Sequence, residues 1–380
     1  MKNFMLFSIV CIMGNALHAS RADADSYDQR LTQLEKQMNE VGGKNSFGSV
    51  GAFYGTDPKT ERAWYVDVEP LLWRTRAGGT EWVLIFNQAD YPLEGTMRNL
   101  QFKWNWGVRV GMGKVIGSEN WDLNAYYTTF TNSQDQKVID TYSSYDVATA
   151  GVAKGQTTGS FKGRINLNLV DLNIGKSLFI SKNVNFHPYA GLLAAWIKQR
   201  YNLLTYNQID ALGTSIPVAG TMNENLVDQC KVFGIGPKLG LDSKWYLCNG
   251  FKINAALAGA LLQSYFDVTH NDYIDLKAVG ESPAVFNNTL DAPLHRLMPT
   301  ARLVLGLGYE KFFMEGKRKL DISLNGEVNH FWRVNQTVNN LSNYPTTVPI
   351  ASESDIRIKY YHYSQDLTFY GVTFKVNVGF

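Results

Sequence analysis

Charged side chains recur at every second position in several apolar or glycine-rich stretches of this sequence. In "VDVEP", for example, Asp67 and Glu69 alternate with valines. If such charges line a water-filled channel they set its ion selectivity, whereas opposed charges that pair across a narrow lumen close it. The two signs nearly balance, so neither an anion nor a cation preference is predicted. The candidate lumen-lining residues are Asp67, Glu69, Lys103, Arg109, Arg164, Lys238, Lys252, Arg302, Glu310, Asp321, Glu327 and Lys375.

Motifs for catalysis or metal binding are not found in the sequence. The phosphate-loop spacing is incomplete in "GMGK", and neither an HExxH, a CxxC nor a GxSxG pattern occurs. We therefore predict that the chain is not an enzyme and holds no cofactor or metal. An enzyme with scattered catalytic residues on a barrel is the minor alternative. None of the six histidines belongs to an HExxH pattern: His18, His187, His270, His295, His330 and His362.

The composition favours β-structure. Aromatic residues make up 13% of the 380 residues, and 33 glycines stand against only 11 prolines. The formal net charge is +2, with 18% charged residues, so the chain has no large basic or acidic surplus. We expect no nucleic-acid partner.

The N-terminal residues predict export. Residues 1–19 combine Lys2, an apolar run and the small residue Ala19, which is typical of a signal peptide. A second cleavage site is "ADA", and the alternative is an uncleaved anchor, although the run is shorter than the ~20 apolar residues that a span needs. No later segment is apolar enough for a membrane helix, but a membrane barrel has amphipathic strands and is allowed.

A short helix is predicted at residues 25–41, followed by a glycine-rich flexible linker at 42–61. Its apolar residues repeat with coiled-coil spacing over about two heptads. The helix is expected either to join subunits of a homo-oligomer or to be a solvated spacer. The candidate oligomerisation residues are Leu31, Leu34, Met38 and Val41.

From residue 62 onward the apolar period changes to two. Ten long strands are predicted, at 62–74, 99–112, 119–131, 160–178, 184–204, 226–243, 246–267, 296–313, 317–334 and 366–380. Short and long connections alternate between them, as in outer-membrane barrels with short periplasmic turns and long external loops. The predicted fold is all-β: a transmembrane antiparallel up-and-down barrel at 62–380, with twelve strands as the alternative if "TEWVLIF" forms a further hairpin.

The bulky apolar face of each strand is expected to contact outer-membrane lipid, because adjacent tryptophans would overfill a narrow interior. In "NLQFKWNWGVRVGM" this face runs from Leu100 and Phe102 through Trp104 to Met112. The last strand must pair with the first to leave no open edge in the bilayer. Phe380, a terminal aromatic residue, is similar to the signal read by the outer-membrane assembly machinery, a predicted partner.

Removal of the signal peptide leaves two cysteines, Cys230 and Cys248. Cys230 is placed toward the outer end of one predicted strand, and Cys248 in the periplasmic turn that follows it. At ~3.3 Å per residue they are too far apart for a disulfide. We predict no bond between them within one chain.

Three stretches resemble the Legionella-type major outer membrane protein family: "WYVDVEPLLWR", "VDLNIGKSLFISKNVNFHPYAGLLAAWIKQRY" and "FYGVTFKVNVGF". The resemblance spans most of residues 62–380. It implies a porin-like protein of the bacterial outer membrane, abundant, surface-exposed, sometimes oligomeric and in contact with a host. The N-terminal helix is not required by the family pattern.

The expected function is passive diffusion of small hydrophilic solutes, with the long loops as a contact surface. The alternative is a closed structural or adhesive barrel without transport. A soluble secreted β-protein is the third possibility, and its solubility without detergent would distinguish it.

Overall fold

The computed structural model describes residues 64–86, 95–116, 120–144, 153–181, 183–209, 220–278, 283–313, 318–342 and 358–380. The predicted signal peptide (1–19), the helix at 25–41 with Leu31, Leu34, Met38 and Val41, and the linker at 42–61 lie outside these residues and stay predictions. Every element in the described part is a strand. None of its segments is a helix that could cross a membrane.

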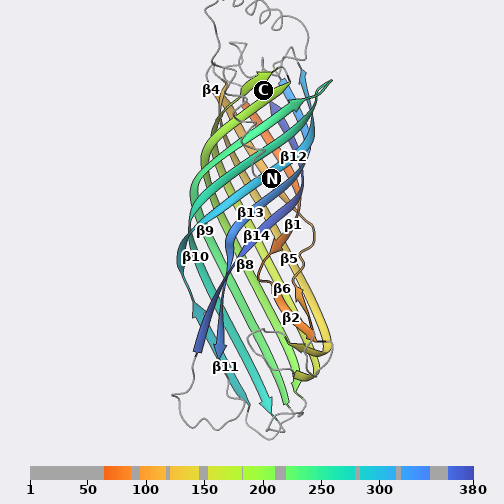
Figure 1. Cartoon of the computed structure of the whole chain (residues 1–380), viewed down its shortest axis with the longest axis vertical. Helices are drawn as coiled ribbons and strands as arrows, with labels where there is room; N and C mark the ends of the chain where they lie inside the picture. The colour runs from red at the N-terminus through yellow and green to blue at the C-terminus, as the bar shows by residue number, and fades with distance from the viewer. Residues whose placement is uncertain are drawn as a thin grey trace, which may run out of the picture.

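The described strands form one sheet of 14 strands that closes on itself (Figure 1). Ten of these strands pair antiparallel with a neighbour on each side and form a closed ring, and the other four are short. The predicted ten-stranded antiparallel barrel is confirmed. In order around the barrel the ten are β1 (Trp64–Ala77), β4 (Asn105–Ile116), β5 (Trp121–Ser144), β6 (Ala153–Lys176), β8 (Val184–Ile209), β9 (Gly220–Tyr246), β10 (Phe251–Ala278), β12 (Leu294–Phe313), β13 (Arg318–Ser342) and β14 (Ile358–Gly379).

The barrel closes through the last residues of the chain. β1 and β14 pair in register, with Val66 opposite Val378. The backbone N–H of Trp64 donates to the Phe380 carbonyl at 2.9 Å, and the Phe380 N–H donates to the Trp64 carbonyl at 2.9 Å. Pairing therefore continues to the terminal residue and leaves no unpaired edge there. The role of Phe380 as an assembly signal stays a prediction.

None of the four short strands adds a further strand to the ring. β2 (Glu81–Phe86) and β3 (Gly95–Asn99) form a hairpin that contains most of "TEWVLIF". Leu84 and Ile85 of β2 also pair with the end of β5. β7 (Leu178–Ser181) pairs with β8, and β11 (Ala284–Asp291) pairs with β10. These two strands continue β6 and β12 in line, along β8 and β10. A further hairpin exists at the predicted place, but the ring still has ten strands.

The strands extend far beyond a bilayer at the end remote from the C-terminus (Figure 1). β8, β9 and β10 are 26, 27 and 28 residues long, whereas a tilted membrane strand needs about 9–11. Much of what the sequence predicted as long polar loops, such as 205–225 and 268–295, is therefore strand. The polar side chains there misled the prediction because they alternate with inward apolar ones.

Two rings of aromatic side chains on the outer face bound the membrane section of the barrel. One ring lies on the terminus side of the barrel, defined by its first and last residues Trp64 and Phe380, and also includes Trp121, Trp245 and Phe251. The ring farther along the strands includes Trp104, Tyr127, Trp196, Phe233 and Tyr265. Exposed aliphatic side chains such as Leu192, Leu305 and Val372 fill the band between them. This is the arrangement of a lipid-facing surface with interfacial girdles. We call the remainder, remote from the termini, the distal section.

The predicted lipid face is wrong at two positions of one strand. Leu100 and Phe102 are buried, with Phe102 only 1% exposed, whereas Trp104 and Met112 are exposed as predicted. β4 begins at Asn105, so residues 100–104 do not continue its alternation. Leu100 and Phe102 instead pack in the apolar cluster inside the distal section.

Candidate functional site

The interior of the membrane section is polar on nearly every strand. Inward positions alternate with lipid-facing ones, so β1 places Asp67 and Glu69 inside between the outward Val66 and Val68. β13 places Asp321 and Glu327 inside in the same way. This strand alternation brings charges from distant parts of the sequence into one lumen.

Glu327 is the centre of the largest charge cluster. Its carboxylate accepts from Arg109 Nη2 at 2.7 Å and from Arg302 Nε at 2.7 Å. Thr373 Oγ1 donates to it at 2.8 Å and Asn329 Nδ2 at 3.0 Å. The side chain of Glu327 is fully buried, and two guanidinium groups with two neutral donors compensate the burial of its charge.

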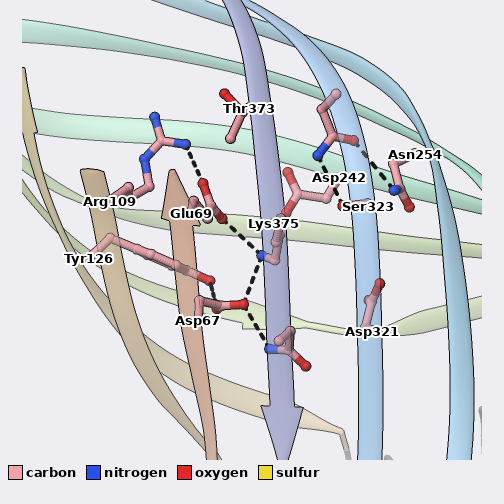
Figure 2. Close-up of polar contacts among 12 residues, drawn as sticks. Asp67, Glu69, Arg109, Tyr126, Asp242, Asn254, Asp321, Ser323, Thr373 and Lys375 are labelled. Atoms are coloured by element: carbon pink, nitrogen blue, oxygen red, sulfur yellow. Dashed lines mark hydrogen bonds and ion pairs between the residues drawn. The ribbon is translucent and has the colours of Figure 1, made fainter. Parts of the chain in front are cut away.

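Arg109 and Lys375 continue this cluster across to β1. Arg109 Nη1 lies 2.6 Å from Glu69 Oε2. Lys375 Nζ lies between the two β1 carboxylates, 3.3 Å from Glu69 Oε1 and 3.1 Å from Asp67 Oδ1, as Figure 2 shows. Tyr126 Oη donates to Asp67 at 2.7 Å. The chain of contacts therefore links β1, β4, β5, β12, β13 and β14 across the lumen.

A second cluster lies toward the termini, around Lys252. Its ammonium group donates to Glu310 at 2.7 Å and also to Asp321. Lys319 Nζ lies 3.4 Å from Glu310. On the neighbouring strand β9, Lys238 donates to Asp171 of β6. The side chains of these three lysines are almost fully buried against their acids, whereas Lys375 and Arg302 of the first cluster are partly exposed.

His187 forms a third cluster with two aspartates. Its Nε2 lies 2.6 Å from Asp122 Oδ1, and its Nδ1 lies 3.9 Å from Asp242 Oδ2. Tyr65 Oη donates to Asp122 at 2.6 Å. At 3.9 Å, the contact between His187 and Asp242 is too long for a hydrogen bond. Within the described ranges, no set of three His, Cys, Asp or Glu side chains could hold a metal ion.

A polar cavity of about 170 Å³ lies among these clusters in the membrane section. Its walls include Asp67, Lys375, His187 and Arg302. Because the acids and bases around it are mostly paired with one another, the cavity presents no strong excess of either sign. A smaller cavity of about 20 Å³ lies next to it, lined by Arg302, Asp171, Leu169, Leu193 and Phe331 among others.

The interior of the distal section is an apolar core. Trp73, Phe130 and Phe369 are almost completely buried. Their rings contact one another, with centroids 5.6 Å apart for Trp73 and Phe130 and 5.6 Å apart for Phe130 and Phe369. Phe331 packs on Phe369 at 6.0 Å. This core fills the barrel directly beyond the polar cavity.

The structure places most of the predicted lumen residues inside the barrel: Asp67, Glu69, Arg109, Lys238, Lys252, Arg302, Glu310, Asp321, Glu327 and Lys375. The prediction that Lys103 and Arg164 line the lumen is wrong, because both side chains are exposed on the outside. Arg164 lies on the outward face between the inward Gly163 and Ile165. Both residues belong to the distal section, where polar side chains point outward.

Several interior polar residues were missed. Asp122, Asp171, His187 and Asp242 line the cavity, and each occupies the polar phase of a predicted strand, so extending the alternation to every strand would have found them. The distal core had a signal too. On β1 the inward phase changes from Asp67 and Glu69 to Leu71 and Trp73.

The two cysteines are not bonded to each other, as predicted. Cys230 is buried in the distal section, where its Sγ donates to the Val334 carbonyl at 3.8 Å. Burial raises the pKa of the Cys230 thiol to about 12, so it remains protonated. Cys248 is exposed in the turn between β9 and β10.

Comparison with known proteins gave one family and several barrel structures. The model of a family described as Legionella pneumophila major outer membrane protein precursor matches residues 56–380. No curated protein matches the chain. The outer membrane protease OmpT from Escherichia coli is 10% identical, with 84% of this chain and 96% of that chain covered and a TM-score of 0.41.

Two transporter structures are similar at the same level. The P. putida toluene transporter TodX is 10% identical, with 86% of this chain and 92% of that chain covered and a TM-score of 0.30. The Ralstonia pickettii toluene transporter TbuX is 12% identical, with 84% and 89% covered and a TM-score of 0.29. These TM-scores are low, so the three resemblances carry no argument about function.

Proposed function

The chain belongs to the Legionella pneumophila major outer membrane protein family, and from this premise we propose that it works as a closed outer-membrane barrel that presents its distal section outside the cell. The chain is an outer-membrane β-barrel by family and fold. The proposal concerns what the barrel does there: it serves as a structural or adhesive surface, without a permanently open pore.

The observation that carries this proposal is the apolar core of the distal section. Trp73 and Phe369 are 0% exposed, and a water-filled path along the barrel axis would expose them and their neighbours. Uncovering one large apolar side chain costs about 1.5–3 kcal/mol. Opening a path past several of them is therefore unfavourable unless another force separates the core.

The ion-paired lumen supports the same conclusion. Arg109 on β4 bridges Glu69 on the neighbouring β1 and Glu327 on β13, and β14 lies between β1 and β13. A solute crossing the membrane section would have to separate such pairs and leave buried charges uncompensated, at a cost of about 3–5 kcal/mol for each broken pair. The paired charges thus act as cross-links of the barrel wall.

Porin-like diffusion of small hydrophilic solutes is the second candidate, favoured by the polar cavity. This cavity occupies the membrane section, and Lys375 and Arg302 keep 28% and 29% of their side chains exposed to it. In that case the distal core would move aside to open the channel. The absence of catalysis stays a prediction under either proposal.

Conductance of the full-length protein in planar bilayers separates the two candidates. We expect no steady single-channel steps from the unmodified protein. A Trp73→Ala/Phe369→Ala variant removes two side chains of the distal core and is expected to conduct, provided that heat-modifiable gel migration shows it folded. Stable steps from the unmodified protein would contradict the closed barrel and favour diffusion.

Assembly forms a separate part of the proposal. Phe380 extends the β1–β14 pairing, and the residue is 59% exposed. We propose that the assembly machinery binds this terminal aromatic residue. Deletion of Phe380 should lower the yield of inserted barrel more than it lowers the stability of barrel already inserted. An unchanged yield would leave Phe380 with a role only in the aromatic girdle.

A further inference from the structure

A group of cations lies on the outer face of the barrel, just beyond the distal aromatic girdle. Arg164 on β6, Lys198 and Arg200 on β8, and Lys231 on β9 are all exposed. These four residues, which we call the basic patch, lie on three neighbouring strands. None of them contributes to the lumen or to the distal core.

Strand pairing places like charges directly opposite one another in the basic patch. Arg164 is the cross-strand partner of Arg200, and Lys198 is the partner of Lys231. Side chains at such positions start only about 4.5–5.5 Å apart, and like charges there repel. Two repulsive pairs on adjacent rows are unfavourable unless an anion lies between them.

The protein itself supplies little compensating charge. Lys231 Nζ lies 3.0 Å from Asp267 at the β10 edge of the patch. Among the described residues, Arg164, Lys198 and Arg200 make no hydrogen bond or ion pair through their side chains. By contrast, the outward Arg74 on β1 donates to the Phe102 carbonyl at 2.8 Å.

The level of the patch relative to the bilayer identifies the kind of anion. Trp196 is the cross-strand partner of Phe233, which is the partner of Tyr265. This aromatic row belongs to the distal girdle. Lys198 and Lys231 lie two residues beyond Trp196 and Phe233 on their strands, in the direction of the distal section. At ~3.3 Å per residue the patch begins about 7 Å beyond the girdle, where lipid head groups lie.

The outer face below the patch is apolar. Leu172, Leu192 and Ile235 on β6, β8 and β9 are about half exposed on the membrane section. Acyl chains can lie against these residues while a head group reaches the cations. The same three strands therefore offer both parts of a lipid site: a hydrophobic strip and a cationic end.

We propose that the basic patch binds the phosphorylated head group of an outer-leaflet lipid, with one phosphate group between Arg164 and Arg200 and another between Lys198 and Lys231. Guanidinium groups bind phosphate in bidentate fashion, and lysine adds a point charge. The two rows of cations match a head group that carries two phosphates. The lipid would neutralise both repulsive pairs.

Native mass spectrometry of the folded full-length protein in detergent tests this proposal. The probes are a bis-phosphorylated acylated disaccharide (lipid A), its mono-phosphorylated form, phosphatidylcholine and inorganic phosphate. The Arg164→Gln/Arg200→Gln variant should bind the bis-phosphorylated lipid about 10-fold to 30-fold more weakly than the unmodified protein. The mono-phosphorylated lipid should bind the unmodified protein more weakly than the bis-phosphorylated one.

A matched control variant, Lys277→Gln/Lys311→Gln, removes the same charge from exposed positions outside the patch. It should keep the affinity of the unmodified protein within about 2-fold, because the attraction is local. Both variants must show heat-modifiable migration, which reports a folded barrel. Equal affinity of the patch and control variants, or equal binding of phosphatidylcholine, would overturn the proposal. Displacement of the lipid by an equal concentration of inorganic phosphate would show a free-anion site and overturn it as well.

Discussion

The membrane section and the distal section of this barrel are built from the same strands but have opposite polarity. On β1, Asp67 and Glu69 point inward in the membrane section, while Val68 faces lipid. Farther along the same strand Leu71 and Trp73 point inward, and Arg76 is exposed on the outside. The alternation of the strand continues without interruption while the chemistry of its two faces is exchanged.

The difference follows from the medium around each section. Lipid surrounds the membrane section, so apolar side chains lie outside and the charges must find partners inside. Water surrounds the distal section, so its apolar side chains form a core as in a soluble barrel. The lumen is therefore held by ion pairs in one section and by hydrophobic packing in the other.

The largest effect is expected from breaking the ion-paired section at its centre. Glu327→Gln removes the charge that compensates Arg302 and part of that of Arg109. Leaving buried cations without their acid should lower the free energy of unfolding by about 3–5 kcal/mol. Denaturant unfolding of the barrel in lipid vesicles measures this change.

The control for this charge change is Lys277→Gln, which removes an exposed ion pair with Asp275. Its effect should stay below about 1 kcal/mol. If Glu327→Gln costs no more than this control, the lumen clusters do not hold the membrane section together.

A charge on the outer face tests where lipid ends and water begins. Leu305 is exposed on the membrane section, so Leu305→Arg should lower the free energy of unfolding by about 2–4 kcal/mol. Asn225→Arg makes the same addition on the exposed face of the distal section, where the change should stay within about 0.5 kcal/mol. The same vesicle unfolding assay compares them. Similar costs at both positions would place the membrane boundary elsewhere.

Removal of one methyl group gives the smallest effect and separates core from lipid-facing surface. Ile197 is 0% exposed in the distal core, so Ile197→Val should cost about 0.5–1.5 kcal/mol. Ile174 faces lipid and is 47% exposed. Ile174→Val leaves no cavity and should cost less than about 0.5 kcal/mol. Thermal or denaturant unfolding that ranks the two in reverse order would argue against a packed distal core.

Much of the fold could be predicted because each long strand keeps a period of two. The ten strands, their closure and most lumen residues follow from that pattern. The period does not show whether each face of a strand meets lipid, water or the interior of the barrel. A prediction that treats every polar face as inward places Lys103 and Arg164 in the lumen, although in the distal section polar side chains point to water.

Pairings between strands could not be predicted either. Arg109 and Glu327 are 218 residues apart in the sequence, and only the register of the closed barrel brings them together. Packing of Leu100 and Phe102 into the distal core likewise depends on where β4 begins. A single sequence specifies the alternation locally but not these long-range partners.

Side-specific labelling of a thiol in the lumen tests most directly whether the distal core closes the barrel. Asn254 lines the polar cavity, and in a Cys11→Ser/Cys248→Ser/Asn254→Cys protein the remaining native thiol is the buried Cys230. In vesicles of known orientation, a charged maleimide should label residue 254 at least about 10-fold faster from the terminus side than from the distal side. The charged reagent reaches the thiolate only through water, and the apolar distal core blocks that route from the distal side. Equal rates from both sides would contradict a closed distal section.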